Sequence, residues 1–166
     1  MLEVVAVSFP GAHSAERELS GLRSTRSDAW LSEASVIERD PDGRYSVKAK
    51  NPSLTADQKG TGAAVGGLTG LFIGIIGGPL GLLFWGAVGA VTGGAIGARH
   101  KSAFKPMIDE LEARLAPDSS MLLLVGESTT ADDFERALQP SADRLVREQL
   151  TSDQEEELTK AIGERR

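Results

Sequence analysis

Residues 60–98 read GTGAAVGGLTGLFIGIIGGPLGLLFWGAVGAVTGGAIGA, a stretch without one charged side chain in a chain of 166 residues. It holds 14 of the 19 glycines, and the nearest charged residues on its two sides are Lys59 and Arg99. The flanking sequences are polar and mixed in character. We therefore expect two parts: an inserted apolar segment at residues 60–98, and one α/β domain built from residues 1–59 and 99–166.

The apolar segment is interrupted at its middle by Gly77, Gly78 and Pro79, residues that end helices. Each arm of about 17 residues would give roughly 25 Å of helix at 1.5 Å per residue. That is slightly short of a hydrocarbon core of about 30 Å. The pattern predicts a helical hairpin that enters a thin region of bilayer or dips into one leaflet.

Glycines in both arms recur every four residues, which places small side chains in one stripe along a helix. Such a stripe, a glycine zipper, lets helix backbones approach closely. The second arm carries two stripes of small residues, a pattern that favours contact with two neighbouring helices and thus a homo-oligomer. The predicted packing positions are Gly62, Gly66, Gly70, Gly74, Gly78, Gly86, Gly89, Gly93, Gly94 and Gly97.

Basic residues at both ends of the segment predict its orientation in a membrane. Under the positive-inside rule they keep both termini and the α/β domain on the cytoplasmic side, whereas an indole near the tip suits the far interface. The start of the chain has no basic region before its short apolar run, so no signal peptide is expected. The predicted interface anchors are Lys59, Trp85, Arg99, His100 and Lys101.

The polar flanks show a regular order of helix and strand signals. The predicted order is a strand at residues 2–9, a helix at 14–30, strands at 34–39 and 45–50, a helix at 103–115, a strand at 121–125, a helix from 130, a strand at 144–150 and a helix to 162. The run at 121–125 is continuously apolar, as expected of a central strand. Residues 144–150 also fit a helix. Residues 40–43 (DPDG) predict a turn between two strands, and Ser152 with Glu155 predicts a capping box at the start of the last helix. The fold expected is α+β: a ferredoxin-like βαββαβ domain with the hairpin inserted after its third strand and a C-terminal α-β-α extension.

Composition and motifs exclude several functions. The net charge of −6 and pI near 5.0 argue against nucleic-acid binding, and the absence of cysteine removes thiolate chemistry. Gly60 and Gly62 follow a polar loop instead of a strand, so no phosphate-binding loop is expected. His13 fits a helix entry better than a catalytic base, and residues 155–157 fit a solvated helix face. No catalytic residue, cofactor, metal or small-molecule substrate is therefore predicted.

Three features together resemble a known family: VIERDPDG at residues 36–43, the apolar segment at 60–98, and MLLLVGE at 121–127. This family consists of small bacterial and archaeal proteins known only as predicted membrane proteins of unknown function. The resemblance covers roughly residues 2–164 and is specific mainly in the apolar segment. It implies a ferredoxin-like cytoplasmic part with an inserted glycine-zipper hairpin, and it implies no activity.

The function expected is that of a non-enzymatic, membrane-associated homo-oligomer that acts as a scaffold, with itself and the bilayer as partners. Two alternatives stay open. The hairpins could instead form the protein-only core of a soluble particle or ring. A small pore along the bundle, lined by Thr69 and Thr92, is the other alternative; each threonine can also bond to its own helix carbonyl.

Overall fold

A computed structural model gives the fold of residues 1–32, 34–48 and 103–163. Its elements, in chain order, are β1 (Leu2–Pro10), α1 (Ser14–Thr25), the 3-10 helix η1 (Ala29–Ser32), β2 (Ser35–Arg39), β3 (Tyr45–Lys48), α4 (Lys105–Arg114), β4 (Ser119–Glu127), α5 (Ser128–Leu138), β5 (Leu145–Gln149) and α6 (Ser152–Gly163). The predicted α+β class is confirmed. The predicted hairpin lies outside the described residues.

The five strands form one antiparallel sheet in the order β3-β2-β4-β1-β5. β1 and β4 pair along nine residues, from Leu2 opposite Glu127 to Pro10 opposite Ser119. Residues 121–125 of β4 are fully buried. The prediction of a central strand from this apolar run is confirmed. The strand favoured for residues 144–150 is also confirmed, since β5 pairs with β1.

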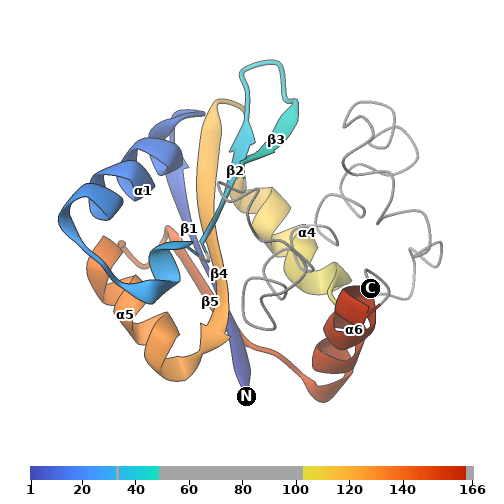
Figure 1. Cartoon of the computed structure of the whole chain (residues 1–166). Helices are drawn as coiled ribbons and strands as arrows, with labels where there is room; N and C mark the ends of the chain where they lie inside the picture. The colour runs from blue at the N-terminus through green and yellow to red at the C-terminus, as the bar shows by residue number, and fades with distance from the viewer. Residues whose placement is uncertain (33, 49–102, 164–166) are drawn as a thin grey trace.

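Helices cover both faces of the sheet, which explains why β4 is apolar at successive positions. On one face α1, η1 and α5 pack over an apolar cluster that includes Leu122 and Leu124 (Figure 1). On the other face α4 packs over a second cluster, which includes Met121 and Leu123. The residues that α4 buries recur at intervals of three and four, as an amphipathic helix requires: Phe104, Met107, Ile108, Leu111 and Leu115.

Between β2 and β3 the predicted turn at residues 40–43 is present. The Asp40 N–H bonds to the Arg44 carbonyl at 2.9 Å, and the Asp40 Oδ1 accepts the Arg44 N–H at 2.8 Å. Gly43 has a φ of +83°, a backbone conformation in which glycine has no Cβ penalty. The turn chemistry of aspartate, proline and glycine thus sets this hairpin.

The first helix is shorter than predicted. α1 ends at Thr25, and Trp30 lies in η1. The hydroxyl groups of Ser24 and Thr25 bond back to the Gly21 carbonyl, and Arg26 is extended with φ −134° and ψ 154°. Hydroxyl side chains that bond to the backbone in this way weaken a helix end. Trp30 is nevertheless buried against the sheet.

The last helix begins with a capping box that lies one residue earlier than predicted. Sequence spacing indicated Ser152 and Glu155. The structure instead pairs Thr151 with Gln154: the Thr151 N–H donates to Gln154 Oε1 at 2.9 Å, and the Gln154 N–H donates to Thr151 Oγ1 at 3.3 Å. Thr151-x-x-Gln154 satisfies the same rule, so the motif is right and its position is wrong.

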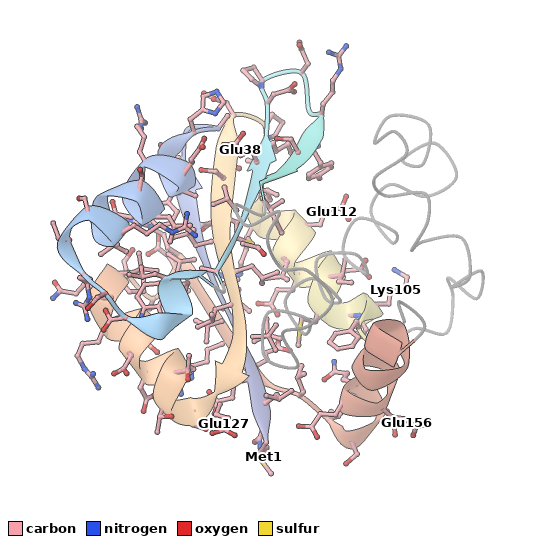
Figure 2. The ribbon with its side chains drawn as sticks, viewed as in Figure 1. Met1, Glu38, Lys105, Glu112, Glu127 and Glu156 are labelled. Carbon is pink, nitrogen blue, oxygen red and sulfur yellow. The ribbon has the colours of Figure 1, made fainter. Side chains whose placement is uncertain are left out.

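The acidic run at residues 155–157 is only partly the solvated face that was predicted. Glu155 Oε1 accepts the Leu2 N–H at 3.0 Å, and Glu157 Oε2 accepts the Ala103 N–H at 2.7 Å. Gln154 Nε2 donates to the Ala103 carbonyl at 3.1 Å. Glu156 is exposed on α6 (Figure 2). α6 therefore holds both the start of β1 and the chain just before α4.

Within residues 1–32, 34–48 and 103–163, no helix is long and apolar enough to cross a membrane.

Candidate functional site

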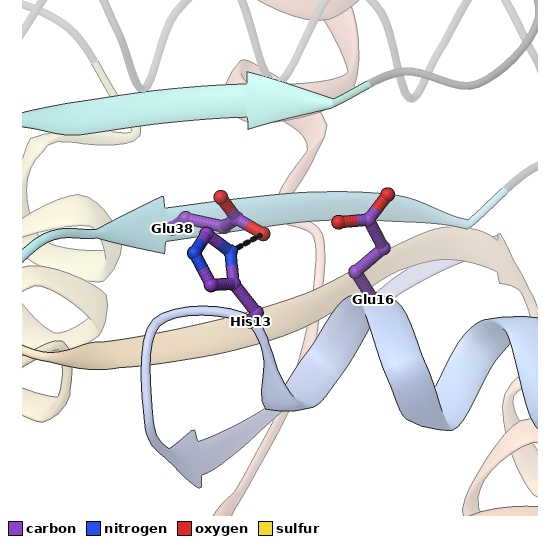
Figure 3. A group of neighbouring side chains, drawn as sticks. All are labelled: His13, Glu16 and Glu38. Atoms are coloured by element: carbon purple, nitrogen blue, oxygen red, sulfur yellow. Dashed lines mark hydrogen bonds and ion pairs between the residues drawn. The ribbon is translucent and has the colours of Figure 1, made fainter.

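Three potential metal-binding side chains come together where α1 begins beside β2. His13 precedes α1, Glu16 lies in its first turn, and Glu38 lies in β2 (Figure 3). Their ligand atoms all lie within 4.8 Å of one another. Among the described residues, this is the group of three side chains that could hold a metal ion. His13 Nδ1 is 3.2 Å from Glu38 Oε1. One imidazole and two carboxylates thus converge on one point.

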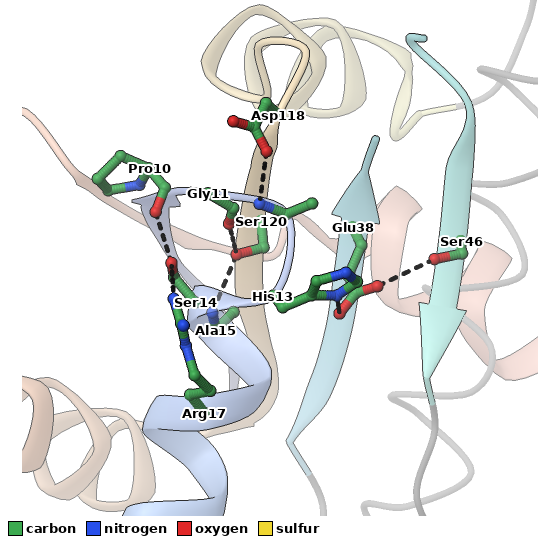
Figure 4. Close-up of polar contacts among 11 residues, drawn as sticks. Pro10, Gly11, His13, Ser14, Ala15, Arg17, Glu38, Ser46, Asp118 and Ser120 are labelled. Atoms are coloured by element: carbon green, nitrogen blue, oxygen red, sulfur yellow. Dashed lines mark hydrogen bonds and ion pairs between the residues drawn. The ribbon is translucent and has the colours of Figure 1, made fainter. Parts of the chain in front are cut away.

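The loop that presents His13 is held by β4. Gly11 has a φ of +93° and donates its N–H to the Asp118 carbonyl at 2.8 Å. Asp118 Oδ1 accepts the Ala12 N–H at 3.2 Å. Ser120 Oγ donates to the Gly11 carbonyl at 2.7 Å and accepts the Ala15 N–H at 2.9 Å (Figure 4). A β4 hydroxyl therefore satisfies a helix N-terminus and fixes the loop at the same time.

Glu38 is a carboxylate on a strand that is buried at four of its five positions. β2 alternates across the sheet, so Glu38 shares the face of Val36, which belongs to the cluster under α1. Its side chain is only 5 % exposed, whereas that of His13 is 70 % exposed. Ser46, opposite Glu38 on β3, donates its hydroxyl to Glu38 Oε2 at 3.3 Å. Burial of a carboxylate is costly without such hydrogen bonds, so the site is built around Glu38.

The residues predicted for packing and membrane anchoring lie at positions 59–101, outside the described residues. The structure therefore tests none of them: Lys59, Gly62, Gly66, Gly70, Gly74, Gly78, Trp85, Gly86, Gly89, Gly93, Gly94, Gly97, Arg99, His100 and Lys101. His13 does stand at the entry of α1, as predicted. Its neighbour Glu38 was missed, because 25 residues separate the two and only the pairing of β2 with β4 brings them together.

Comparison with known families gives one result. Residues 62–163 match the model of a family described as "Protein of unknown function (DUF1269)". The chain belongs to the DUF1269 family. No curated protein and no solved structure gives a significant match. The resemblance drawn from the sequence is thus supported as far as a family of unknown function.

The DUF1269 match includes α4, β4, α5, β5 and α6 but not the first five elements of the chain. His13, Glu16 and Glu38 accordingly lie outside the matched residues. Most of the apolar segment, from residue 62, and α6, which bonds to Ala103, lie inside them. The family description therefore says nothing about the three-residue group.

A second charged group, mostly within the DUF1269 match, ties α5 to the sheet. Arg147 on β5 lies 2.7 Å from Glu3, 2.7 Å from Asp132 and 3.0 Å from Glu135. Hydrogen bonds to Glu3, Asp132 and Glu135 raise the pKa of the Arg147 guanidinium. Hydrogen bonds from Ser128 and from Arg147 lower the pKa of Glu3. One cation with three carboxylate neighbours is a structural junction, because it ties β5 to Glu3 on β1 and to Asp132 and Glu135 on α5.

A third group joins α4 to β5. Burial, followed by a hydrogen bond to Glu110, raises the pKa of the Glu148 carboxyl. Glu110 also pairs with Arg114 at 3.1 Å, one turn along α4. Two carboxyl groups in hydrogen-bond contact must share a proton or repel each other. The charged form of Glu148 is therefore destabilised at this contact.

Replacing Glu148 with glutamine is expected to raise the melting temperature at pH 7 by a few degrees. Folding raises the Glu148 pKa, so the stability that this group supplies is fully present below the unfolded pKa of about 4.3. It is lost as the pH rises through the folded value. Thermal unfolding at pH 7 and pH 4 measures this, because the gain should disappear at pH 4. The exposed Glu18→Gln is the control; an equal gain at both pH values would contradict the charge explanation.

Proposed function

We propose that this DUF1269 protein is a non-enzymatic, membrane-associated homo-oligomer whose residues 60–98 form helical hairpins that bundle through glycine stripes. The proposal rests mainly on the uneven distribution of charged residues and glycines along the sequence. Between Lys59 and Arg99 there is no charged side chain, and 14 of 19 glycines lie there. In water so many glycines would each cost about 0.5–1 kcal/mol of helix stability relative to alanine, a loss that close helix packing offsets.

The arrangement of the described elements is compatible with an inserted segment. Five strands from the described residues form one sheet, and helices from the described residues cover both of its faces. The segment leaves after β3, an edge strand, and the chain returns at α4. An insertion at an edge leaves the central strands undisturbed. This supports a division into one α/β domain (residues 1–59 and 99–166) and one hairpin.

We further propose that the α/β domain contains a ferredoxin-like unit formed by β1, α1, β2, β4, α5 and β5. These elements follow the order βαββαβ, and their strands are arranged β5-β1-β4-β2. α1 and α5 cover the same face of the sheet. β3 is then an added edge strand, and α4 covers the opposite face. This assignment differs from the one based on sequence, in which residues 45–50 were the third strand.

In this proposal α6 links the domain to the hairpin. Ala103 lies five residues after Ala98 and is held at both its N–H and its carbonyl by Glu157 and Gln154. Because Ala103 is held in this way, the domain would set the direction of the second hairpin arm. The basic residues Arg99 and Lys101 then lie between this fixed point and the bilayer. The localisation proposed is the cytoplasmic membrane, with both termini and the domain on the cytoplasmic side.

Membrane insertion can be tested with the two tryptophans of the chain. In the Trp30→Phe variant, Trp85 is the one remaining indole. Its fluorescence is expected to shift to shorter wavelength when the protein is mixed with phospholipid vesicles, because an indole near the bilayer interface loses water. Lipids with brominated acyl chains should quench it. The full-length protein should also pellet with the vesicles.

Trp85→Phe is the matched control, since Trp30 is only 3 % exposed in the α/β core and should not respond to vesicles. Recovery of the wild-type protein as a discrete, detergent-free oligomer, with Trp85 unaffected by brominated lipid, would contradict membrane association. That result would instead support the alternative of a soluble particle with the hairpins in a protein-only core.

A further inference from the structure

We propose that His13, Glu16 and Glu38 bind one divalent first-row transition-metal ion of the Zn²⁺ type. The ligand set is one imidazole nitrogen and two carboxylate oxygens, all within 4.8 Å of one another. Imidazole together with carboxylate suits zinc and its neighbours in the first row. Mg²⁺ and Ca²⁺ prefer oxygen ligands alone. Two carboxylates also supply the two negative charges that balance a dication.

The distances require only a small adjustment. With metal–ligand bonds of about 2.0–2.2 Å, two ligands of one tetrahedral ion lie about 3.3 Å apart. His13 Nδ1 and Glu38 Oε1 already lie 3.2 Å apart. Glu16 is half-buried in the first turn of α1, where its side chain can turn toward them (Figure 3). Metal binding would replace the direct contact between His13 and Glu38 with a shared ion.

Burial and outer contacts make this a built site instead of a surface coincidence. Glu38 is 5 % exposed and is directed at the imidazole, and its second oxygen is held by Ser46 Oγ. The loop carrying His13 is fixed through Ser120 and Asp118 (Figure 4). Hydrogen bonds behind the ligands are a regular feature of metal sites because they orient the ligands. His13 is 70 % exposed, so a metal has an entry path and room for water ligands.

The test is a Zn²⁺ titration of the full-length protein, purified without a histidine tag and stripped with a chelator. Calorimetry is expected to show one Zn²⁺ bound per chain. Co²⁺ should give a visible absorption band that Zn²⁺ removes. His13→Ala should lower Zn²⁺ affinity by more than about tenfold, and Ser46→Ala, which removes an outer hydrogen bond, by about tenfold.

The chain offers matched controls for two of the three ligands, His13 and Glu16. His100→Ala removes the other histidine, and Glu18→Gln changes an exposed glutamate one half-turn from Glu16. Neither should alter the affinity, whereas Glu16→Gln should lower it. His13→Ala also removes a contact of the buried Glu38 carboxylate, so the melting temperature of the metal-free variant is measured beside its affinity to confirm that it is folded.

Two outcomes would overturn the proposal. Absence of Zn²⁺ binding to the wild-type protein would mean that His13 and Glu38 only contact each other directly. Binding that survives His13→Ala and is lost in His100→Ala would place the metal elsewhere. The titration needs neither bilayer nor oligomer, so its failure would leave the proposed membrane association untouched.

Discussion

Replacing Gly70 and Gly74 together with leucine is expected to convert the proposed oligomer into monomers. The two glycines are consecutive members of the stripe that runs from Gly62 to Gly78 at intervals of four. In such a stripe the helices approach closely because no side chain stands between their backbones. Two leucines would hold the helices apart while keeping the segment apolar. Light scattering coupled to size-exclusion chromatography, in one mild detergent for all variants, measures the mass.

The matched control is Gly21→Leu. Gly21 lies on the exposed side of α1, where a Cβ atom would meet nothing within 4 Å. A leucine there makes the same kind of substitution at one position without touching the proposed stripe, so the oligomer should persist. If the Gly70→Leu/Gly74→Leu protein keeps its full mass, the stripe is not the contact surface, and both the bundled hairpin and its soluble alternative lose their main support.

The local signals in the polar flanks predicted the elements well where one physical effect dominates. Residues 121–125 could be placed at the centre of a sheet because a strand covered on both faces is apolar at successive positions, and five residues is a typical strand length. The turn after Arg39 could be identified because aspartate, proline and glycine have fixed backbone preferences. The capping box of α6 was displaced by one residue, since Thr151 and Ser152 satisfy the same motif and only the geometry of the helix start distinguishes them.

Strand order could not be predicted in the same way. The sequence shows that β3 follows β2 across a tight turn, but not which strand lies between β2 and β1. In the structure that strand is β4, more than 70 residues along the chain from β3. The physical reason is burial. β4 is apolar on both faces, so a central position buries most of its apolar surface. In Tyr45–Lys48 apolar and polar residues alternate, which suits an edge strand.

The candidate metal site illustrates the same limit. His13 was recognised as a helix-entry residue, which is a local property. Glu38 looked like one charge at the end of a strand. Their contact depends on β2 pairing with β4 and on β4 holding the His13 loop through Ser120, two long-range facts. One signal in the sequence could have pointed to Glu38. It stands two residues after Val36 and therefore shares the buried face of the strand, where a carboxylate is rarely found without a partner.

Replacing Phe134 with alanine is expected to destabilise the α/β domain by about 3–5 kcal/mol, the usual cost of deleting a buried aromatic ring. Phe134 is fully buried in the cluster beneath α1 and α5. Its ring meets that of Trp30 edge to face, with centroids 5.2 Å apart and planes at 79°. The loss would leave a cavity beside an indole. Urea unfolding, followed by Trp30 fluorescence in a Trp85→Phe background, measures the change.

Leu138→Ala on the same helix is the matched control, because Leu138 is only partly buried against that cluster. Its cost should be clearly smaller; equal costs would mean that α5 does not pack as described.

The same pair of tryptophans tests whether the chain has two parts. In a Trp30→Phe background, Trp85 reports on the segment at residues 60–98. Trp30 Nε1 has no hydrogen-bond partner among the described residues, so phenylalanine at that position removes no known hydrogen bond. If the α/β domain and the hairpin are separate units, Phe134→Ala should move the Trp30 transition to lower urea and leave the Trp85 signal in place. A joint shift of both signals would mean that the apolar segment and the sheet fold as one cooperative unit.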